Sequence, residues 1–127
     1  MSWDDVKSLQ VMGFDIGGHT MNHANLAAIP LEEAQEEIRG CRQMLTDKLR
    51  TTAIHFAYPF GGQDNISQAT RQMVQDLGFT CCLSCHGGLV SATDDPFDLR
   101  REPINGWVAS PYQYGFELLT RASEGVS

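Results

Sequence analysis

Hydrophobic and polar positions follow two different periods along the chain. Apolar residues at spacings of three and four predict helices over residues 3–12, 31–49, 65–77 and 111–122. Shorter apolar or alternating runs predict strands over residues 14–17, 54–58, 79–84 and 99–104. Strands that alternate with helices of this length favour an α/β fold with a parallel sheet.

The helix over residues 31–49 has the clearest pattern. Pro30 pre-sets its first turn, which is acidic, and its last turn is basic, so both ends complement the helix dipole. Its inward stripe is expected to consist of Leu31, Ala34, Ile38, Cys41, Leu45 and Leu49. Local capping signals support the other helices: Ser2 with Asp5 resembles a capping box, and Ser110 is placed as an N-cap.

The stretch FDIGGHTMNH, residues 14–23, joins a short strand to a glycine pair and two histidines. If residues 19–23 form one helical turn, His19 and His23 project from the same face and can bind one metal ion. The loop at residues 58–61 follows the next strand, so it is expected at the same rim of a parallel sheet. The spacing alone leaves a surface or capping role open, and two imidazoles leave a coordination sphere incomplete.

Composition limits the partners. The 127 residues suffice for one domain, and 42% hydrophobic with 20% charged residues is typical of a globular protein. The net charge of −7 argues against a nucleic acid or an anionic membrane as partner. No apolar run approaches the roughly 20 residues that span a bilayer. The N-terminus does not resemble a signal peptide, so we expect the chain to stay where it is made, in the cytoplasm as written.

The four cysteines allow more than one interpretation. Cys81 and Cys82 are adjacent in a predicted strand and would point to opposite faces, so they cannot easily bond each other. The run from Cys82 through Cys85 to His86 matches the C-x-x-C-H pattern of haem attachment, and it also permits a zinc half-site or a redox pair. Small buried thiols remain the favoured interpretation.

Three further groups carry polar or aromatic chemistry. The acidic stretch 94–98, beside Arg100 and Arg101, is expected to be a solvated loop anchored by its proline and phenylalanine. His55 falls within a predicted strand, on the opposite pleat from its neighbour, where a structural role is favoured. Aromatic side chains that could line a sugar-binding groove, or simply pack in a core or interface, are Trp107, Tyr112 and Tyr114.

Three segments resemble, in their order and spacing, the polysaccharide deacetylase family. They are GGHTMNH at 17–23, followed by Leu26, then HFAYPFGG at 55–62 and GLVSATDDPFDLRREPI at 88–104. That family comprises metal-dependent carbohydrate esterases that act on N-acetylated or O-acetylated sugars. The resemblance implies an irregular (β/α) barrel, of which this chain would form a C-terminal portion as one incomplete domain over residues 1–127.

The resemblance also implies roles for single residues. His19 and His23 would be the imidazole ligands of a divalent metal, most often zinc and otherwise cobalt or nickel. Thr20 would support their loop by a hydrogen bond. The backbone N–H of Phe60 would help to hold an oxyanion. Arg101 lies near the position of a family arginine and would act electrostatically.

The resemblance shows departures as well. Ala57 stands where the family's loop has an arginine. The family's strand ending in paired aspartates, which supplies a base and the third ligand, has no counterpart, because Asp4 and Asp5 lie in the first turn of a predicted helix. The family's Leu-x-His motif, which supplies an acid, is also missing.

The resemblance implies deacetylation of an acetylated carbohydrate. The alternatives are a remnant that binds metal or carbohydrate or acts only within an oligomer, and a thiol-based function of Cys82 and Cys85. An opened barrel exposes a sheet edge, so we expect a second copy to cover it.

Overall fold

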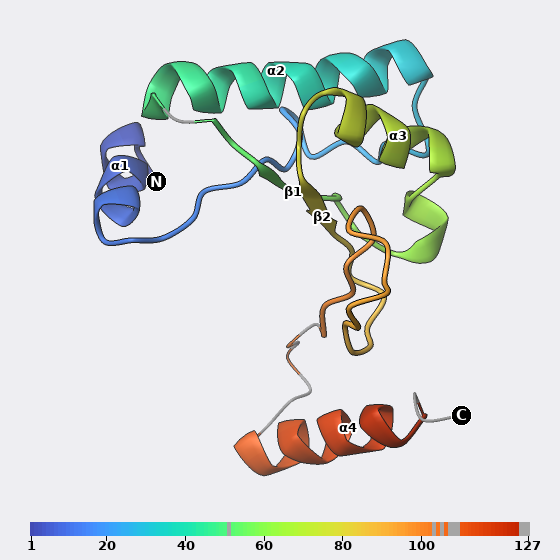
Figure 1. Ribbon diagram of the computed structural model, residues 1–127. Helices are drawn as coiled ribbons and strands as arrows, with labels where there is room; N and C mark the ends of the chain where they lie inside the picture. The colour runs from blue at the N-terminus through green and yellow to red at the C-terminus, as the bar shows by residue number, and fades with distance from the viewer. Residues whose placement is uncertain (51, 103, 105, 107–109, 125–127) are drawn as a thin grey trace.

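The computed structural model describes residues 1–50, 52–102, 104, 106 and 110–124. Helices α2 and α3 pack against each other on one side of the two strands, and α4 lies apart from this body (Figure 1). In chain order the elements are α1 (Trp3–Val11), α2 (Leu31–Leu49), β1 (His55–Ala57), a 3₁₀ turn (Gln63–Asn65), α3 (Gln68–Asp76), β2 (Cys81–Leu83) and α4 (Pro111–Glu124).

The sheet is parallel, as the alternation of strands and helices predicts. Strands β1 and β2 are neighbours and run in the same direction. One parallel bridge extends the sheet on each side, from Gly18 to Phe56 and from Leu83 to Leu99. Four chain segments therefore lie side by side with their carboxyl ends at one rim.

The predicted strands 14–17 and 99–104 are wrong in extent, because the first segment pairs only at Gly18, just after its predicted end, and the second pairs only at Leu99 among the described residues. On one edge, the Gly18 N–H donates to the His55 carbonyl at 2.8 Å, whereas Phe14 before it is 57% exposed. On the other edge, the Leu99 N–H donates to the Cys82 carbonyl at 2.9 Å, after which the chain leaves the sheet. A segment with one neighbour gains little from continued pairing. The central strands are also shorter than expected, and Pro103 lies outside the described residues.

The first two helices match their predicted positions. Ser2 and Asp5 form the expected capping box, since the Ser2 Oγ accepts from the Asp5 N–H and the Asp5 carboxylate accepts from the Ser2 N–H. The bounds of α2 are those expected. Its inward stripe is buried except for Leu31, which is 51% exposed because it belongs to the first turn, beyond the edge of the core.

The later helices are capped by serines. Helix α3 begins three residues later than predicted, because the Ser67 Oγ accepts from the Thr70 N–H at 3.1 Å and sets the start of the helix. Thr70 is therefore buried, and Ala69 before it is exposed. Ser110 caps α4 as predicted, with its Oγ accepting from the Gln113 N–H at 3.2 Å.

The two faces of the sheet differ. Phe56 of β1 and Cys82 of β2 are 1% and 0% exposed and lie in the core with α2 and α3. Their neighbours along each strand are half-buried, so the predicted opposite orientations of Cys81 and Cys82 are confirmed. A cavity of about 500 Å³ lies along this second face. Its lining residues are Asp15, Gly17, Gly18, His19, His55, Phe56, Ala57, Cys81 and Leu83.

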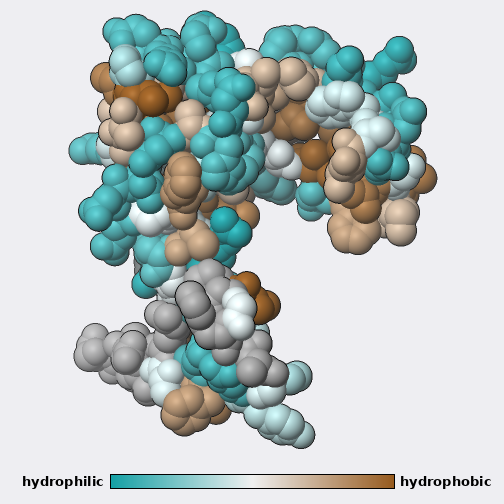
Figure 2. Space-filling view, turned by 180° about the vertical axis from the view of Figure 1, so that it is seen from behind, coloured by the Kyte–Doolittle hydropathy of each residue, from teal (hydrophilic) through white to brown (hydrophobic). Residues whose placement is uncertain are grey.

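Apolar side chains are exposed at both ends of the chain. Figure 2 shows hydrophobic surface on the arm that carries α1, where Val11 and Met12 are exposed. Helix α1 packs on the core through Trp3 and Val6 instead. On α4, Tyr112 is 89% exposed. Among the described residues, no helix is both long and apolar enough to cross a membrane.

Candidate metal-binding site

Two loops meet at the carboxyl end of the sheet. We call residues 18–23 the histidine loop and residues 58–62, which follow β1, the Phe60 loop. The rings of His19 and His23 lie with centroids 4.9 Å apart, and those of His23 and Phe60 lie at the same distance. The prediction that the two loops share one rim is confirmed, and the two imidazole rings lie in contact there.

The predicted helical turn over residues 19–23 is wrong. The histidine loop is irregular, and Thr20 and His23 have φ of 64° and 56°, in the left-handed region. Such a backbone costs about 1–2 kcal/mol for each residue that carries a Cβ, so other contacts must maintain it. Glu37 of α2 supplies them, because its carboxylate accepts from the N–H groups of Met21 and Asn22 at 2.9 and 2.8 Å. These hydrogen bonds replace those of a helical turn.

His19 is oriented by a backbone carbonyl. Its Nδ1 lies 2.8 Å from the Ala57 carbonyl oxygen. A carbonyl can only accept, so Nδ1 carries the proton, and in the neutral ring Nε2 keeps a free lone pair. A hydrogen bond from one ring nitrogen to a carbonyl is typical of histidines that bind metal through the other. The backbone of Ala57 therefore takes part in the site although its side chain cannot replace an arginine.

Thr20 does not make the hydrogen bond expected of it. Its hydroxyl oxygen is buried and has no partner among the described residues. A buried hydroxyl without a partner is rare in native proteins, because the lost hydration is not compensated. The histidine loop thus holds one polar atom that a group from outside the described residues would satisfy.

The Phe60 loop contains one backbone N–H that has no acceptor among the described residues. The Tyr58 N–H still donates to the Leu83 carbonyl at 3.0 Å, and the Gly61 N–H donates to the Pro59 carbonyl at 2.7 Å. Between them, Phe60 has φ of 64°, and no acceptor for its N–H is found among the described residues. An oxyanion site requires a backbone N–H without an acceptor, and here it belongs to the residue whose ring contacts His23.

Gly61 fixes this loop against the next one. The Cys85 N–H donates to the Gly61 carbonyl at 2.7 Å. A Cβ at Gly61 would lie only 2.8 Å from the Cys85 nitrogen, and φ at Gly61 is +66°. The close approach and the backbone angle both require glycine.

The two histidines have no third potential metal ligand beside them in the described part of the chain. No group of three or more His, Cys, Asp or Glu residues that could hold a metal occurs there. Asp5 serves the α1 cap, and Asp4 pairs with Lys7 at 3.4 Å. Neither is placed beside the histidines. Asp15 lines the same cavity as His19 and was missed by sequence reasoning, although its alternation with two apolar neighbours placed it on this face.

Arg101 lies farther along the rim. Its Nε donates to the Ser84 carbonyl at 2.9 Å, beyond the end of β2. The histidine loop is on the opposite side of the sheet order, with β1 and β2 between them. No contact of Arg101 with the histidines or Phe60 is recorded among the described residues.

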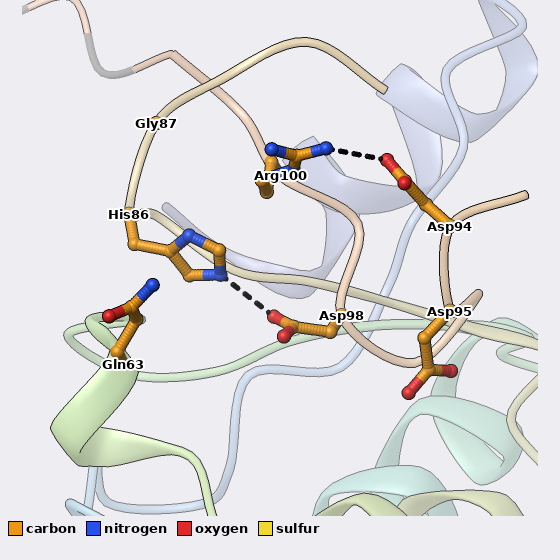
Figure 3. A pocket seen from close by; sticks show the side chains of 7 residues that line it. All are labelled: Gln63, His86, Gly87, Asp94, Asp95, Asp98 and Arg100. Atoms are coloured by element: carbon orange, nitrogen blue, oxygen red, sulfur yellow. Dashed lines mark hydrogen bonds and ion pairs between the residues drawn. The ribbon is translucent and has the colours of Figure 1, made fainter. Parts of the chain in front are cut away.

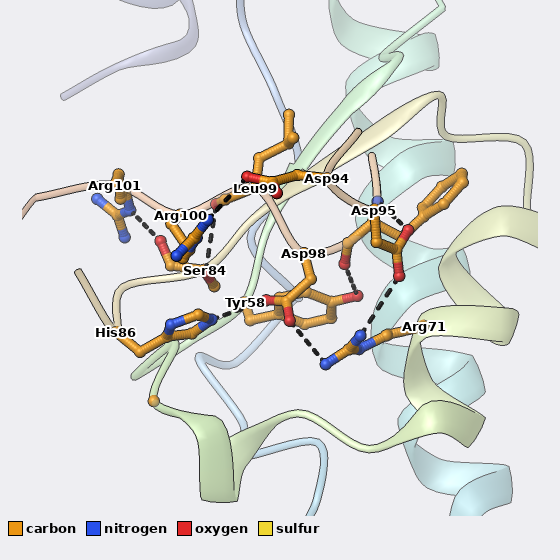
Figure 4. Close-up of polar contacts among 12 residues, drawn as sticks. Tyr58, Arg71, Ser84, His86, Asp94, Asp95, Asp98, Leu99, Arg100 and Arg101 are labelled. Atoms are coloured by element: carbon orange, nitrogen blue, oxygen red, sulfur yellow. Dashed lines mark hydrogen bonds and ion pairs between the residues drawn. The ribbon is translucent and has the colours of Figure 1, made fainter. Parts of the chain in front are cut away.

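The segment after β2, residues 84–101, is called the acidic loop here. The Nε2–H of His86 donates to the Asp98 carboxylate at 3.0 Å, and Arg71 of α3 pairs with Asp98 at 2.7 Å (Figure 4). Asp98 is 17% exposed, so the expectation of an ordinary solvated loop is wrong. The cause is Arg71, which also reaches Asp95 at 3.3 Å and draws the aspartates against α3.

Figure 3 shows the cavity that this loop encloses, with a volume of about 360 Å³. Arg100 pairs there with Asp94 at 3.0 Å, and the pKa of Asp94 is lowered by the Ser91 N–H and by Arg100. The predicted anchoring by Phe97 is confirmed, since its side chain packs on the core. The Nε2 atom of His86 is hydrogen-bonded to Asp98, so it is not available as the histidine ligand of a C-x-x-C-H haem site would be.

The cysteines are all free thiols. Burial raises the pKa of the Cys82 thiol far above its usual range, and burial also raises that of Cys81. A thiol that stays protonated is a poor nucleophile and a poor metal ligand. This favours the prediction of small buried thiols.

A family model for polysaccharide deacetylases matches residues 1–82. The chain belongs to that family. The match includes His19, His23 and Phe60 and stops before Arg101. A search of curated proteins finds no significant match.

Solved deacetylases share the fold. The deacetylase PplD of Streptococcus pyogenes, in complex with acetate, matches 93% of this chain with a TM-score of 0.82 and 22% identity. A polysaccharide deacetylase from Bacillus cereus matches 93% at 0.78 and 20% identity. A de-N-acetylase from Aggregatibacter actinomycetemcomitans matches 91% at 0.72 and 14% identity.

The chain spans only 50%, 36% and 53% of the length of these three proteins. The predicted fold class is confirmed: parallel strands alternate with helices as in part of a polysaccharide deacetylase barrel.

Proposed function

We propose that this chain forms the metal-binding part of a deacetylase that removes acetyl groups from an N-acetylated or O-acetylated polysaccharide or oligosaccharide. The observation that carries the proposal is the row of His19, His23 and Phe60 at one rim. His19 keeps Nε2 free because its Nδ1 is bound to the Ala57 carbonyl. The family match over these residues supports the same conclusion.

His19 and His23 fit a divalent cation as two of its ligands. Imidazole nitrogen suits zinc and also cobalt or nickel. When bound, the metal would supply Lewis-acid polarisation of the acetyl carbonyl. The Thr20 hydroxyl, next to His19 in the chain, is buried and has no hydrogen-bond partner among the described residues.

The chain's own contribution to the reaction is binding and charge stabilisation. The Phe60 N–H would donate to the acetyl oxygen as negative charge develops on it. Water adds to the acetyl carbon, the carbon–nitrogen bond of the N-acetyl group breaks, and acetate and a free amine result. Arg101 would add positive charge along the rim. Neither a base nor an acid is assigned among the described residues.

The lack of a third ligand in the described part of the chain favours a second candidate function. In it, the chain is a remnant that binds metal or acetylated carbohydrate without turnover. Binding and hydrolysis are separable, so one experiment distinguishes the two.

Acetate release from acetylated chitooligomers, with zinc or cobalt added, tests the proposal. We expect release that a chelator stops and that the double variant His19→Ala/His23→Ala lacks. The matched control is His86→Ala, which removes a histidine at the same rim that is already committed to Asp98. Metal binding that the double variant abolishes, without acetate release, would favour the remnant. Neither binding nor release would overturn both.

The second face of the sheet supports a proposal about assembly. The cavity of about 500 Å³ and the half-buried side chains along β1 and β2 leave this face open. We propose that a second copy of the chain covers it. A monodisperse monomer by light scattering at high protein concentration would contradict this.

A further inference from the structure

Helix α2 presents one specialised face to the histidine loop. Glu37, Gly40 and Cys41 are spaced by three and four residues, so they lie on one side of the helix. Each contacts the backbone or a side chain of residues 18–22. Neither the metal nor the oxyanion function assigned above uses this face.

Glu37 makes the densest set of these contacts. One carboxylate oxygen accepts from the N–H groups of Met21 and Asn22, and the other accepts from the Asn22 side-chain amide. The side chain is buried, at 9% exposure. Burial raises the pKa of Glu37, but the hydrogen bonds from Asn22 and Met21 outweigh it, and the net pKa is below the usual value. A buried carboxylate with this many donors is ionised at neutral pH.

Cys41 and Gly40 complete the contact. The His19 N–H points at the Cys41 sulfur at 3.4 Å, and burial raises the pKa of this thiol, so it acts as a neutral acceptor. At Gly40, a Cβ would lie 3.1 Å from the Met21 side chain. A larger residue there would push the loop away from the helix.

Three of the four backbone N–H groups from residue 19 to residue 22 thus donate hydrogen bonds to side chains of α2. The loop between the two histidines has left-handed φ at Thr20 and His23, which it would not keep unaided. The contact therefore decides where the two imidazoles stand relative to each other.

We propose that Glu37 is a positioning residue, whose carboxylate holds the loop between His19 and His23 in the conformation that lets both rings bind one divalent cation. This rests on the proposed function, because it presupposes the metal pair. Glu37 itself does not touch the cation. It acts through the backbone of Met21 and Asn22.

The test compares Glu37→Ala, Glu37→Gln and Glu33→Ala, with affinity for Co²⁺ measured by calorimetry in the whole chain. Glu33 is exposed one turn earlier on α2 and serves as the matched control. We expect Glu37→Ala to weaken Co²⁺ binding by about 10–100-fold, as for other residues that orient metal ligands. Glu37→Gln keeps one oxygen for the two N–H groups and should recover most of the loss, and Glu33→Ala should change nothing.

A second readout needs no metal. Hydrogen exchange of the Met21 and Asn22 amides should accelerate in Glu37→Ala and much less in Glu37→Gln, while exchange in β1 stays as in the unchanged chain. Unchanged Co²⁺ affinity in a folded Glu37→Ala variant would overturn the inference and leave the proposed function standing. If the unchanged chain binds no Co²⁺, the proposed function fails. Unaltered exchange at Met21 and Asn22 would then overturn the role of Glu37 as well.

Discussion

The histidine loop and the acidic loop both follow strands at the same rim, yet they satisfy their polar groups in opposite ways. In the histidine loop the backbone is held by Glu37 and Cys41, and the side chains of His19 and His23 keep their chemistry available. In the acidic loop the side chains bind one another, as His86 and Arg71 do with Asp98. In the histidine loop the hydrogen bonds to α2 are made mainly by backbone N–H groups, whereas in the acidic loop the stabilising contacts are made mainly by side chains.

The contrast also separates two histidines that look alike in the sequence. His19 has a ring nitrogen bound to a backbone carbonyl and is exposed. His86 is 14% exposed and bound to a carboxylate. The difference decides which of them can take a metal, and the following predictions test it from the largest expected effect to the smallest.

Exchanging the two histidines for alanine should give opposite results. His19→Ala should weaken zinc or cobalt affinity by about 100-fold or more, because even residues that only orient a ligand are worth 10–100-fold. Its free energy of unfolding should hardly change, since the ring is exposed. His86→Ala should leave metal affinity unchanged and cost about 1 kcal/mol of stability. Calorimetric titration measures the metal affinity of each variant, and urea unfolding measures its stability. Equal losses of affinity in the two variants would contradict the distinction between the two histidines.

The Phe60 loop and the acidic loop lie so close at Gly61 that any side chain there should destabilise the fold. Gly61→Ala should cost about 2–3 kcal/mol, because it adds a contact of 2.8 Å with the Cys85 backbone to the strain of a left-handed φ. Gly13→Ala is the matched control. Gly13 also has positive φ but nothing lies within 4 Å of its Cβ position. If urea unfolding gave the same loss of stability for both variants, the two loops would not be closely packed at Gly61.

Within the acidic loop, Asp98 should matter more than Asp95. Asp98→Asn removes the charge that binds both Arg71 and His86 and should cost about 2 kcal/mol, as for a charged hydrogen bond that is largely shielded from water. Asp95→Asn removes the other partner of Arg71, but Asp95 is 47% exposed, so less than about 1 kcal/mol is expected. Thermal unfolding of both variants provides the measurement. A reversed order would show that the network does not centre on Asp98.

The smallest effect concerns pH. Hydrogen bonds from Asn22 and Met21 outweigh burial and lower the pKa of Glu37 in the folded chain below its usual value of 4.5. The stabilisation is therefore fully present above that value and is lost as the pH falls through the lower folded-state pKa. Protection of the Met21 and Asn22 amides should stay constant from pH 7 to about pH 5 and decline below about pH 4. Loss of protection already near pH 6 would point to a histidine instead of Glu37.

Features that depend on the local sequence pattern could be predicted from the sequence. The long apolar stripe placed α2 with its observed bounds, and the spacing of His19 and His23 indicated a shared site. Capping residues placed the start of α1 and of α4. For the helices, the deciding interactions lie within a few residues of the chain, so the local pattern contains them.

Contacts between distant residues were not predictable in this way. The extent of the strands depends on neighbours, so Phe14 was placed in a strand that has no partner on its outer side among the described residues. The conformation of the histidine loop depends on Glu37, fifteen residues away. One signal was present, because Glu37 is a charged residue between Ala34 and Ile38 in the buried stripe of α2. A charge in that position indicates a buried partner.

The most direct test of the metal pair is ¹⁵N nuclear magnetic resonance of the histidine rings during titration with Zn²⁺. We predict that His19 carries its proton on Nδ1 before metal is added. On titration, the Nε2 signal of His19 and the ring signals of His23 should shift together. The ring of His86 should stay unchanged through the same titration. A proton on Nε2 of His19, or a response of His86 without one of His19 and His23, would contradict it.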